Sequence, residues 1–245
     1  MRLYGLIGKT LSHSFSKGYF AKKFATEGIA DCAYESFELS NIDEFPRLIS
    51  SHPELCGLNV TIPYKEAVLP FLDEQSEDVE AIGACNCIKV QGGKLIGYNT
   101  DAYGFKTSIK PHLKSHHQQA LVFGSGGASK AIQYVLKELG IRFKVVSRKP
   151  LPNELPYEAI DKEVLKAHTL LVNTTPLGMY PNIDSCPLIP YKHLTSAHFL
   201  YDAVYNPVKT LFLEKGERQG AQICNGYQML IEQAEESWRI WNAMD

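Results

Sequence analysis

A glycine cluster follows an apolar run in the middle of the chain, where residues 120–130 read ALVFGSGGASK. The run has the length of a buried strand, and the residues after it place apolar side chains on one helical face. Glycine suits such a strand-to-helix turn because a bare backbone can approach a pyrophosphate, whose charge is met by free N–H groups and the helix dipole. The turn therefore predicts a dinucleotide site, with contacts from Gly124, Ser125, Gly126, Gly127 and Ala128.

A second predicted strand, in the segment Phe143–Lys149, carries the residues that would select the form of the dinucleotide. Arg148 lies 148 − 126 = 22 residues after Gly126. An NAD-selective site commonly has an acidic residue near this point to hold the ribose 2′-hydroxyl, whereas a 2′-phosphate requires arginine. Ser147, Arg148 and Lys149 supply a hydroxyl and two cations and no carboxylate. We therefore predict NADP rather than NAD; the alternative interpretation is a basic turn on a domain that binds no nucleotide.

A lysine follows the strand predicted over residues 57–62, which Pro63 must end because proline cannot donate to a β-ladder. In open α/β sheets, ligands bind at the carboxyl ends of strands, so Thr61 and Lys65 stand where chemistry is usually found. A surface lysine after a turn is the alternative interpretation of Lys65. Asn173–Met179 is another polar loop at the end of a predicted strand.

Hydroxyl-bearing residues follow the first predicted strand, Arg2–Gly8. Ser14 and Ser16 either cap the next helix or point donors and acceptors into a pocket that grips a polyhydroxylated or carboxylated small molecule. Asp101 follows a hairpin predicted over residues 86–98, and its simpler interpretation is a helix N-cap. The sequence pattern leaves these alternatives open.

The order of the elements predicts an α/β protein with two domains. From Ala120 onward, strands alternate with helical connections, the pattern of a Rossmann-like, doubly wound parallel sheet. The first hundred residues form a separate α/β unit, and the C-terminal helix must bury its apolar face, most simply on that unit. We expect a substrate-binding and catalytic domain at 1–101, completed by 226–245, and a dinucleotide-binding domain at 102–225.

The composition excludes several classes of function. The chain of 245 residues is 44% hydrophobic and 21% charged, as in an ordinary globular protein. Its formal net charge of −2 gives no electrostatic reason to expect nucleic acid or a membrane surface as partner. No apolar run approaches the roughly 20 residues needed to cross a bilayer, and the glycine-broken N-terminal segment is too short for a signal peptide. We expect a cytoplasmic monomer or homodimer.

Cysteine spacing gives no sign of a metal. The six cysteines are scattered, with no C-x-x-C pair and no histidine at zinc spacing, so we expect reduced thiols and no metal site. Two histidines, His116 and His117, stand in a polar link before the glycine cluster and are expected to be solvated.

Short polar motifs are distributed over nearly the whole chain. In chain order they are LSHSFS (11–16), NVTIPYKE (59–66), GACN (83–86), GYNTD (97–101), GSGGA (124–128), NTTPLGM (173–179), YDAVYNP (201–207) and MLIEQA (229–234). In this order and spacing they resemble the motifs of the shikimate dehydrogenase family. The chain departs from the family's usual pattern at Lys17, Cys87, Ser147 and Tyr227–Gln228.

The resemblance implies reversible, NADPH-linked reduction of 3-dehydroshikimate to shikimate in aromatic amino-acid biosynthesis. It implies Lys65 and Asp101 as the catalytic pair. By motif match, the residues that would contact the substrate are Ser14, Ser16, Thr61, Asn86, Asp101, Tyr205 and Gln233. Those that would hold NADP are Gly124, Ser125, Gly126, Gly127, Ala128, Ser147, Arg148, Lys149 and Thr175, with Ala203, Gly226 and Glu77 toward the nicotinamide.

The implied chemistry suits these residue types. Reducing a ketone requires a hydride on carbon and a proton on oxygen, and a protonated lysine can supply the proton. In the oxidising direction the neutral lysine would act as base, and Asp101 would orient Lys65 and a substrate hydroxyl. The nicotinamide carries the hydride, so no metal is required.

Two other functions are compatible with the motifs. One is a quinate/shikimate dehydrogenase with broader substrate or NAD use. The other is a non-catalytic sensor that keeps the pocket for NADP and shikimate without turnover. The presence of Lys65 and Asp101 argues against the sensor.

Overall fold

The computed structural model describes residues 1–11 and 14–243. Ser12 and His13 of the first polar motif lie outside the described residues. The chain divides into two compact units, one formed by Met1–Thr100 with Ala234–Asp245 and one formed by Asp101–Gln233. The last helix, α9 (Tyr227–Asn242), is continuous; its first turns belong to the second unit and its later turns to the first.

The first unit is a mixed sheet with helices on its faces, and its strand order is β2-β1-β3-β5-β6-β4. Its strands are β1 (Arg2–Gly8), β2 (Cys32–Glu38), β3 (Leu55–Val60), β4 (Glu74–Gln75), β5 (Cys87–Gln91) and β6 (Lys94–Tyr98). Its helices are α1 (Phe15–Glu27), α2 (Phe45–Ser51), α3 (Tyr64–Ala67) and α4 (Glu77–Ile82), with 3₁₀ turns at η1 (Ile42–Glu44) and η2 (Leu69–Phe71).

The predicted hairpin forms as expected. β5 and β6 pair antiparallel, and the turn between them uses Gly92 and Gly93 at φ values of 59° and 81°. Positive φ at both central residues matches the twist of the flanking strands, and glycine adopts it without a steric penalty. This hairpin returns the chain to the edge of the sheet where β5 began.

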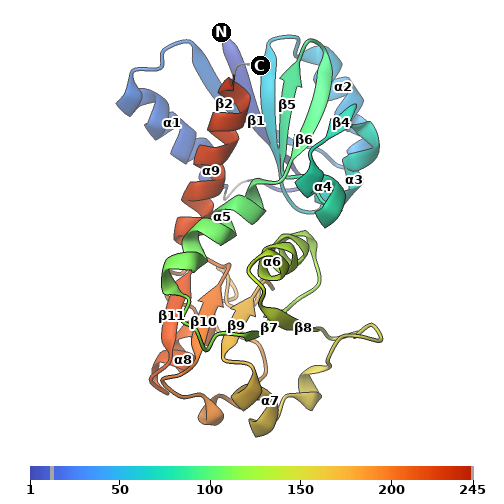
Figure 1. Cartoon of the computed structure of the whole chain (residues 1–245). Coiled ribbons are helices and arrows are strands. Elements are labelled where there is room, and N and C mark those ends of the chain that lie inside the picture. The colour runs from blue at the N-terminus through green and yellow to red at the C-terminus, as the bar shows by residue number, and fades with distance from the viewer. Residues whose placement is uncertain (12–13, 244–245) are drawn as a thin grey trace. The chain divides into compact units, whose positions relative to one another are not determined.

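Aromatic residues fill the face of this sheet that α1 and α9 cover (Figure 1). The rings of Phe20 and Tyr34 stack with centroids 4.4 Å apart, and those of Tyr4 and Trp241 with centroids 4.9 Å apart. The Trp241 indole donates a hydrogen bond of 3.0 Å to the Ile88 carbonyl. Aromatic burial and this bond therefore fix the later turns of α9 on the sheet.

The second unit has a parallel sheet of order β11-β10-β9-β7-β8. Its strands are β7 (Gln119–Phe123), β8 (Arg142–Val146), β9 (Leu170–Asn173), β10 (Phe199–Asp202) and β11 (Gln222–Asn225). Its helices are α5 (Thr100–Ile109), α6 (Gly127–Glu138), α7 (Lys162–Ala167) and α8 (Leu211–Glu217), with 3₁₀ turns at η3 (Lys110–His112), η4 (Tyr157–Ala159) and η5 (Tyr191–His193).

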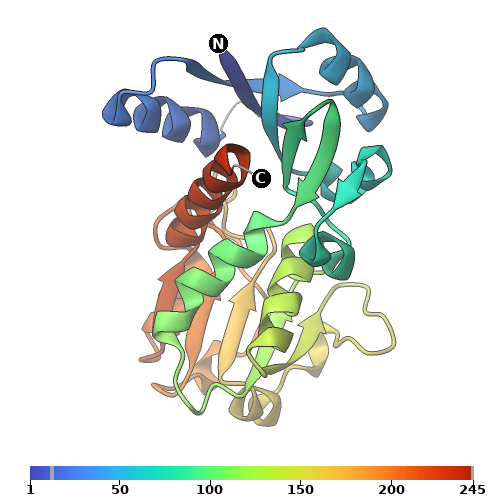
Figure 2. The same cartoon turned by 45° about the horizontal axis from the view of Figure 1, so that its top comes forward.

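This strand order confirms the predicted Rossmann-like, doubly wound sheet. β7 lies between β8 and β9, so the connections that leave β7 and β8 run in opposite directions across the sheet. Helices α5 and α6 cover one face, and α7 and α8 cover the other (Figures 1 and 2). Ligands of such sheets bind outside the carboxyl ends of the strands where the order reverses, here between β7 and β9.

Two details differ from the expectations. The strand predicted in the segment Phe143–Lys149 is shorter than expected, since β8 ends at Val146. The chain turns there, and Leu155 forms an isolated bridge back to Val146. His117 is buried, so the expectation that it is solvated was wrong, whereas His116 is exposed. Burial lowers the pKa of His117, and the neighbouring His116 acts in the same direction.

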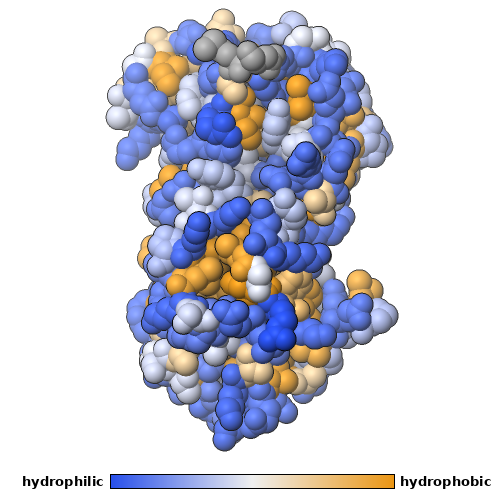
Figure 3. All heavy atoms as spheres, viewed as in Figure 1, coloured by the Kyte–Doolittle hydropathy of each residue, from blue (hydrophilic) through white to orange (hydrophobic). Residues whose placement is uncertain are grey.

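The face seen in Figure 3 is mostly polar, with an apolar area on the second unit between α5 and α6.

Among the described residues, no helix is both long enough and apolar enough to cross a membrane. All six cysteine side chains are free thiols, and Cys85, Cys87 and Cys186 are buried.

Candidate active site

Strand directions in the first unit bring the segments predicted to bind substrate to one edge of the sheet. β1 and β3 are parallel neighbours. The segment after β1 carries Ser14 and Ser16, and the segment after β3 carries Thr61 and Lys65. β5 is antiparallel to β3, so Asn86, which precedes β5, lies at the carboxyl end of β3. Residues more than seventy positions apart in the chain therefore share one sheet edge.

Backbone hydrogen bonds fix the lysine to this edge. Lys65 lies in the short helix α3 and is half-buried. Its carbonyl accepts a hydrogen bond of 2.8 Å from the Cys85 N–H. The next residue, Asn86, has a carbonyl that accepts a bond of 2.9 Å from the Val60 N–H. The backbone of Lys65 is thus placed by the strands, independently of its own side chain.

The buried Asn86 side chain starts a hydrogen-bond network through the first unit. Its Oδ1 accepts a bond of 2.6 Å from the Thr100 N–H, and the Thr100 hydroxyl lies 3.2 Å from Ser237 Oγ. Asn59 Nδ2 donates to Ser237 Oγ at 2.8 Å. The Tyr34 hydroxyl donates to Asn59 Oδ1 at 2.9 Å. The network therefore ties β2, β3 and α9 to the segment that carries Asn86.

The two predicted serines have different roles in the fold. Ser14 is the N-cap of α1, and its Oγ accepts a bond of 3.3 Å from the Ser16 N–H; this use of the oxygen leaves the hydroxyl hydrogen of Ser14 as a donor. Burial raises the pKa of Tyr34, and the nearby Ser16 side chain acts in the opposite direction. Ser16 therefore lies close to Tyr34, one of the residues of the network that begins at Asn86.

Sequence reasoning missed Tyr34, Asn59 and Ser237. Ser237 follows Ala234 by three residues and precedes Trp241 by four, so it lies on the buried stripe of α9. A small polar residue on an apolar helical stripe needs a hydrogen-bond partner inside the protein. That spacing was the available signal for Ser237. Tyr34 has the pattern of an ordinary strand residue, and Asn59, although part of the motif at 59–66, was assigned no role.

Three predicted substrate residues belong to the second unit: Asp101, Tyr205 and Gln233. α5 begins at Thr100, so the buried Asp101 lies inside the first turn and is not the N-cap. A Cβ on Gly104 would lie 2.5 Å from the Met229 carbonyl oxygen, so the α5 backbone packs closely on the first turns of α9, which carry Gln233. Burial raises the pKa of the Tyr205 hydroxyl.

The glycine loop lies at the point where the strand order of the second sheet reverses. Gly124 has φ of 105°, a conformation that favours glycine, and its N–H donates to the Val146 carbonyl at 2.9 Å. A Cβ here would lie 2.7 Å from Thr174 Oγ1. The loops after β7 and β9 are therefore in contact, and only glycine fits at position 124.

The start of α6 fits a dinucleotide phosphate. Gly126 is the N-cap and has no side chain to cap the first N–H groups, and a Cβ built on Gly126 meets open space within 4 Å. Ser129 lies in the first turn of α6, and its buried hydroxyl donates to the Gly124 carbonyl at 2.6 Å. Free N–H groups and the helix dipole can then meet a pyrophosphate.

A buried carboxylate holds the segments after β9 and β10. Asp202 Oδ1 accepts from Asn173 Nδ2 at 2.9 Å and from the Val204 N–H at 3.0 Å, and its Oδ2 accepts from Thr210 at 2.5 Å. Burial raises the pKa of Asp202 to about 6, although these bonds act in the opposite direction. Asn173 Oδ1 in turn accepts from the Thr175 hydroxyl at 2.7 Å, which fixes that predicted cofactor contact.

The residues assigned to the nicotinamide side lie in both units. A Cβ on Gly226 would overlap the Ala203 backbone, so these two residues of the second unit are in contact. Glu77 is the exposed first residue of α4 in the first unit.

The end of β8 carries both signs of charge. Ser147 is buried, and Arg148 and Lys149 are exposed. The Ser147 hydroxyl donates to Glu154 Oε2 at 2.9 Å. We predicted no carboxylate at the end of this strand, because Glu154 follows Ser147 by seven residues in the chain.

Comparison with known proteins identifies the family. A model of the shikimate dehydrogenase substrate binding domain matches residues 6–88. A Caldicellulosiruptor saccharolyticus protein named shikimate dehydrogenase (NADP(+)) is 37% identical over 98% of this chain and 91% of its own length. The chain belongs to the shikimate dehydrogenase family.

Two solved structures of similar fold extend the comparison. Shikimate 5-dehydrogenase from Thermus thermophilus, in complex with NADP(H) and shikimate, is 29% identical with a TM-score of 0.88 and covers 100% of this chain and 94% of its own. A quinate dehydrogenase from Corynebacterium glutamicum in complex with NAD is 26% identical with a TM-score of 0.88, covering 99% and 94%. The predicted family, oxidoreductase class, reaction and NADP cofactor are confirmed.

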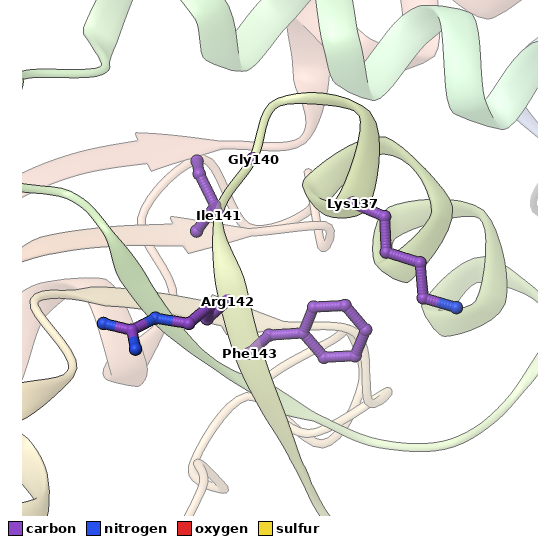
Figure 4. A pocket seen from close by; sticks show the side chains of 5 residues that line it. All are labelled: Lys137, Gly140, Ile141, Arg142 and Phe143. Carbon is purple, nitrogen blue, oxygen red and sulfur yellow. The ribbon is translucent and has the colours of Figure 1, made fainter.

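A shallow hollow elsewhere in the second unit lies between the end of α6 and the start of β8 (Figure 4). β8 begins there, so the hollow is at the sheet edge opposite the glycine loop. The side chains of Lys137 and Arg142 point away from each other in Figure 4. The two cations do not converge on a ligand, and we assign none.

Proposed function

We propose that the first unit binds 3-dehydroshikimate and shikimate at the sheet edge formed by the ends of β1 and β3, and that Lys65 is the general acid and base of the reaction. The observation that supports this proposal is that Lys65 and Asn86 lie on neighbouring segments of one sheet edge. The Cys85 N–H, directly before Asn86, donates a hydrogen bond of 2.8 Å to the Lys65 carbonyl. The Lys65 ammonium, the Asn86 amide and the hydroxyls of Ser14 and Ser16 can form hydrogen bonds with a ligand that carries a carboxylate, hydroxyls and a ketone.

In the reducing direction, the Lys65 ammonium gives a proton to the carbonyl oxygen, and in the oxidising direction the neutral amine takes it back. Asp101 orients the Lys65 side chain and one substrate hydroxyl. Bound NADPH supplies the hydride. Ser14, Ser16, Thr61 and Asn86 would bind polar groups of the substrate, and Tyr205 and Gln233 would supply further contacts.

The second unit would hold NADP through the glycine loop. The backbone of Gly124, Ser125, Gly126, Gly127 and Ala128 would meet the pyrophosphate at the start of α6. Arg148, with Ser147 and Lys149, would meet the 2′-phosphate, because a planar guanidinium recognises phosphate by two parallel hydrogen bonds. Thr175 would also contact NADP, and Ala203, Gly226 and Glu77 would lie toward the nicotinamide.

The first test is a spectrophotometric assay of NADPH and NADH oxidation or of their formation, with shikimate and quinate as the alcohols and 3-dehydroshikimate as the ketone. We expect turnover of 3-dehydroshikimate with NADPH. A purified protein that binds both compounds without turnover would instead be the sensor.

The second test is Lys65→Ala. Loss of a general acid and base should reduce kcat by about two to four orders of magnitude while shikimate binding, measured by calorimetry, changes by less than about fivefold. Lys94→Ala is the matched control, because Lys94 is an exposed lysine of the same unit that pairs with Glu74 at 2.6 Å. A fall in kcat of less than tenfold would show that Lys65 does not carry the proton.

A second candidate function is a quinate/shikimate dehydrogenase with broader substrate or NAD use. The similarity to a quinate dehydrogenase solved with NAD favours it. Equal kcat/KM on shikimate and quinate would support this candidate.

We place the reaction in the cytoplasm, with the first unit as the substrate domain and the second as the dinucleotide domain.

A further inference from the structure

The loop that follows β8 closes on itself. The Ser147 N–H donates to the Leu155 carbonyl at 3.1 Å, and the Leu155 N–H donates to the Val145 carbonyl at 2.8 Å. Residues 148–154 are thereby held as a short loop at the carboxyl end of the strand. β8 is the parallel neighbour of β7, and its Val146 carbonyl bonds Gly124 of the glycine loop.

A carboxylate organises the inside of this loop. Glu154 Oε2 accepts two hydrogen bonds, from the Ser147 hydroxyl at 2.9 Å and from the Leu151 N–H at 3.1 Å. Within the part of the chain that the structure describes, Glu154 Oε1 accepts no hydrogen bond. The half-buried carboxylate therefore keeps one oxygen for a further donor.

The same loop also presents a cation that Glu154 does not neutralise. Arg148 is exposed and forms no ion pair with any described residue. The carboxyl end of β8 consequently offers a guanidinium for a phosphate and a carboxylate oxygen for a hydroxyl. These are the two groups that distinguish a 2′-phosphate from a ribose 2′-hydroxyl in a doubly wound sheet.

We propose that Glu154 is a specificity-determining residue of the cofactor site, which accepts a hydrogen bond from the ribose 2′-hydroxyl of NAD and so lets this chain bind NAD as well as NADP. The inference rests on the proposed function, because it assumes that the nucleotide lies along the glycine loop. Arg148 attracts the 2′-phosphate of NADP while Glu154 repels it, so the two charges offset each other.

Glu154→Gln separates charge from loop geometry. The amide oxygen can still accept from Ser147 and Leu151, but the negative charge is gone. We expect the variant to bind the 2′-phosphate about three to ten times more tightly and the 2′-hydroxyl form about three to ten times more weakly, as is usual for a partly exposed charge–charge contact and a hydrogen bond to a charged group. Glu154→Ala should weaken both forms, because the loop loses its internal acceptor.

The test is calorimetric titration of the whole chain with adenosine 2′,5′-bisphosphate and adenosine 5′-monophosphate, followed by NADPH and NADH titrations read by fluorescence. Glu158→Gln is the matched control, since it removes an exposed negative charge from the same connection between β8 and β9. In the wild type the two adenosine ligands should bind within about tenfold of each other. Glu154→Gln should shift their ratio about tenfold or more toward the bisphosphate, and Glu158→Gln less than about twofold.

An unchanged ratio in Glu154→Gln would overturn the inference while leaving the cofactor site intact. A wild type that binds the bisphosphate more than about a hundred times better than the monophosphate would also overturn it. If neither nucleotide nor either full cofactor binds, the assignment of the glycine loop fails, and the inference fails with it. Circular dichroism of each variant verifies that a changed affinity does not reflect unfolding.

Discussion

Replacing Ser237 by alanine tests whether the buried network supports both the fold of the first unit and its substrate edge. Ser237 is fully buried, and its hydroxyl lies between Asn59 Nδ2 at 2.8 Å and Thr100 Oγ1 at 3.2 Å. Alanine fits the space but offers no acceptor. The substitution removes polar contacts without adding bulk.

The expected loss of stability follows from the hydrogen-bond donor that Ser237→Ala leaves without its acceptor, Asn59 Nδ2. After the change, the nearest acceptor for Asn59 Nδ2 in the network is the Asn86 carbonyl at 3.3 Å, which is a long hydrogen bond. Leaving a buried donor poorly satisfied costs about 1–3 kcal/mol. We therefore expect the free energy of unfolding of the first unit to fall by about 1–3 kcal/mol. Because Thr100 also bonds Asn86, we expect the KM for shikimate to rise about three- to tenfold with kcat changed less than about threefold.

Tryptophan fluorescence during urea unfolding measures this effect directly. The chain has two tryptophans, Trp238 and Trp241, and both lie in the part of α9 that belongs to the first unit. Ser50→Ala is the matched control, because Ser50 is an exposed helical serine whose hydroxyl bonds the Arg47 carbonyl at 3.0 Å. Its loss should change stability by less than about 0.5 kcal/mol. If Ser237→Ala is as stable as Ser50→Ala, the network does not stabilise the unit and the reasoning is refuted.

Arg148→Ala should raise the KM for NADPH by about tenfold or more with little change in kcat, because an exposed guanidinium would act on binding; an unchanged KM would contradict its assignment. Burial raises the pKa of Asp202 to about 6 from 3.8, so the folded state holds the proton more tightly. The wild type should therefore lose roughly 3 kcal/mol relative to Asp202→Asn as pH rises from about 4 to 6, and unfolding followed by circular dichroism across that range will show whether it does. Gly57→Ala should destabilise the first unit by about 3 kcal/mol, because its Cβ would overlap the Trp241 ring, whereas Gly18→Ala, with open space around it, should be neutral or stabilising in the same urea titration.

The sequence predicted those parts of the protein that depend on near neighbours in the chain. The strand, glycine turn and helix around Gly124 follow from an apolar run, a residue that tolerates φ of 105° and a helical repeat of buried positions. The hairpin around Gly92 and Gly93 follows from the same kind of local rule. The motifs also gave the family, since their order and spacing are properties of the chain itself.

Tertiary structure alone decided which side chains meet. Ser237 reaches Asn59 across 178 residues, and Tyr34 reaches Asn59 across 25, because strand order and the return of α9 bring them together. Glu154 reaches Ser147 because the loop after β8 closes on itself, which placed a carboxylate where the sequence indicated only cations. Local patterns fix the conformation of the backbone over a few residues, whereas hydrogen-bond partners are set by how distant segments pack, and no spacing rule in the sequence encodes that packing.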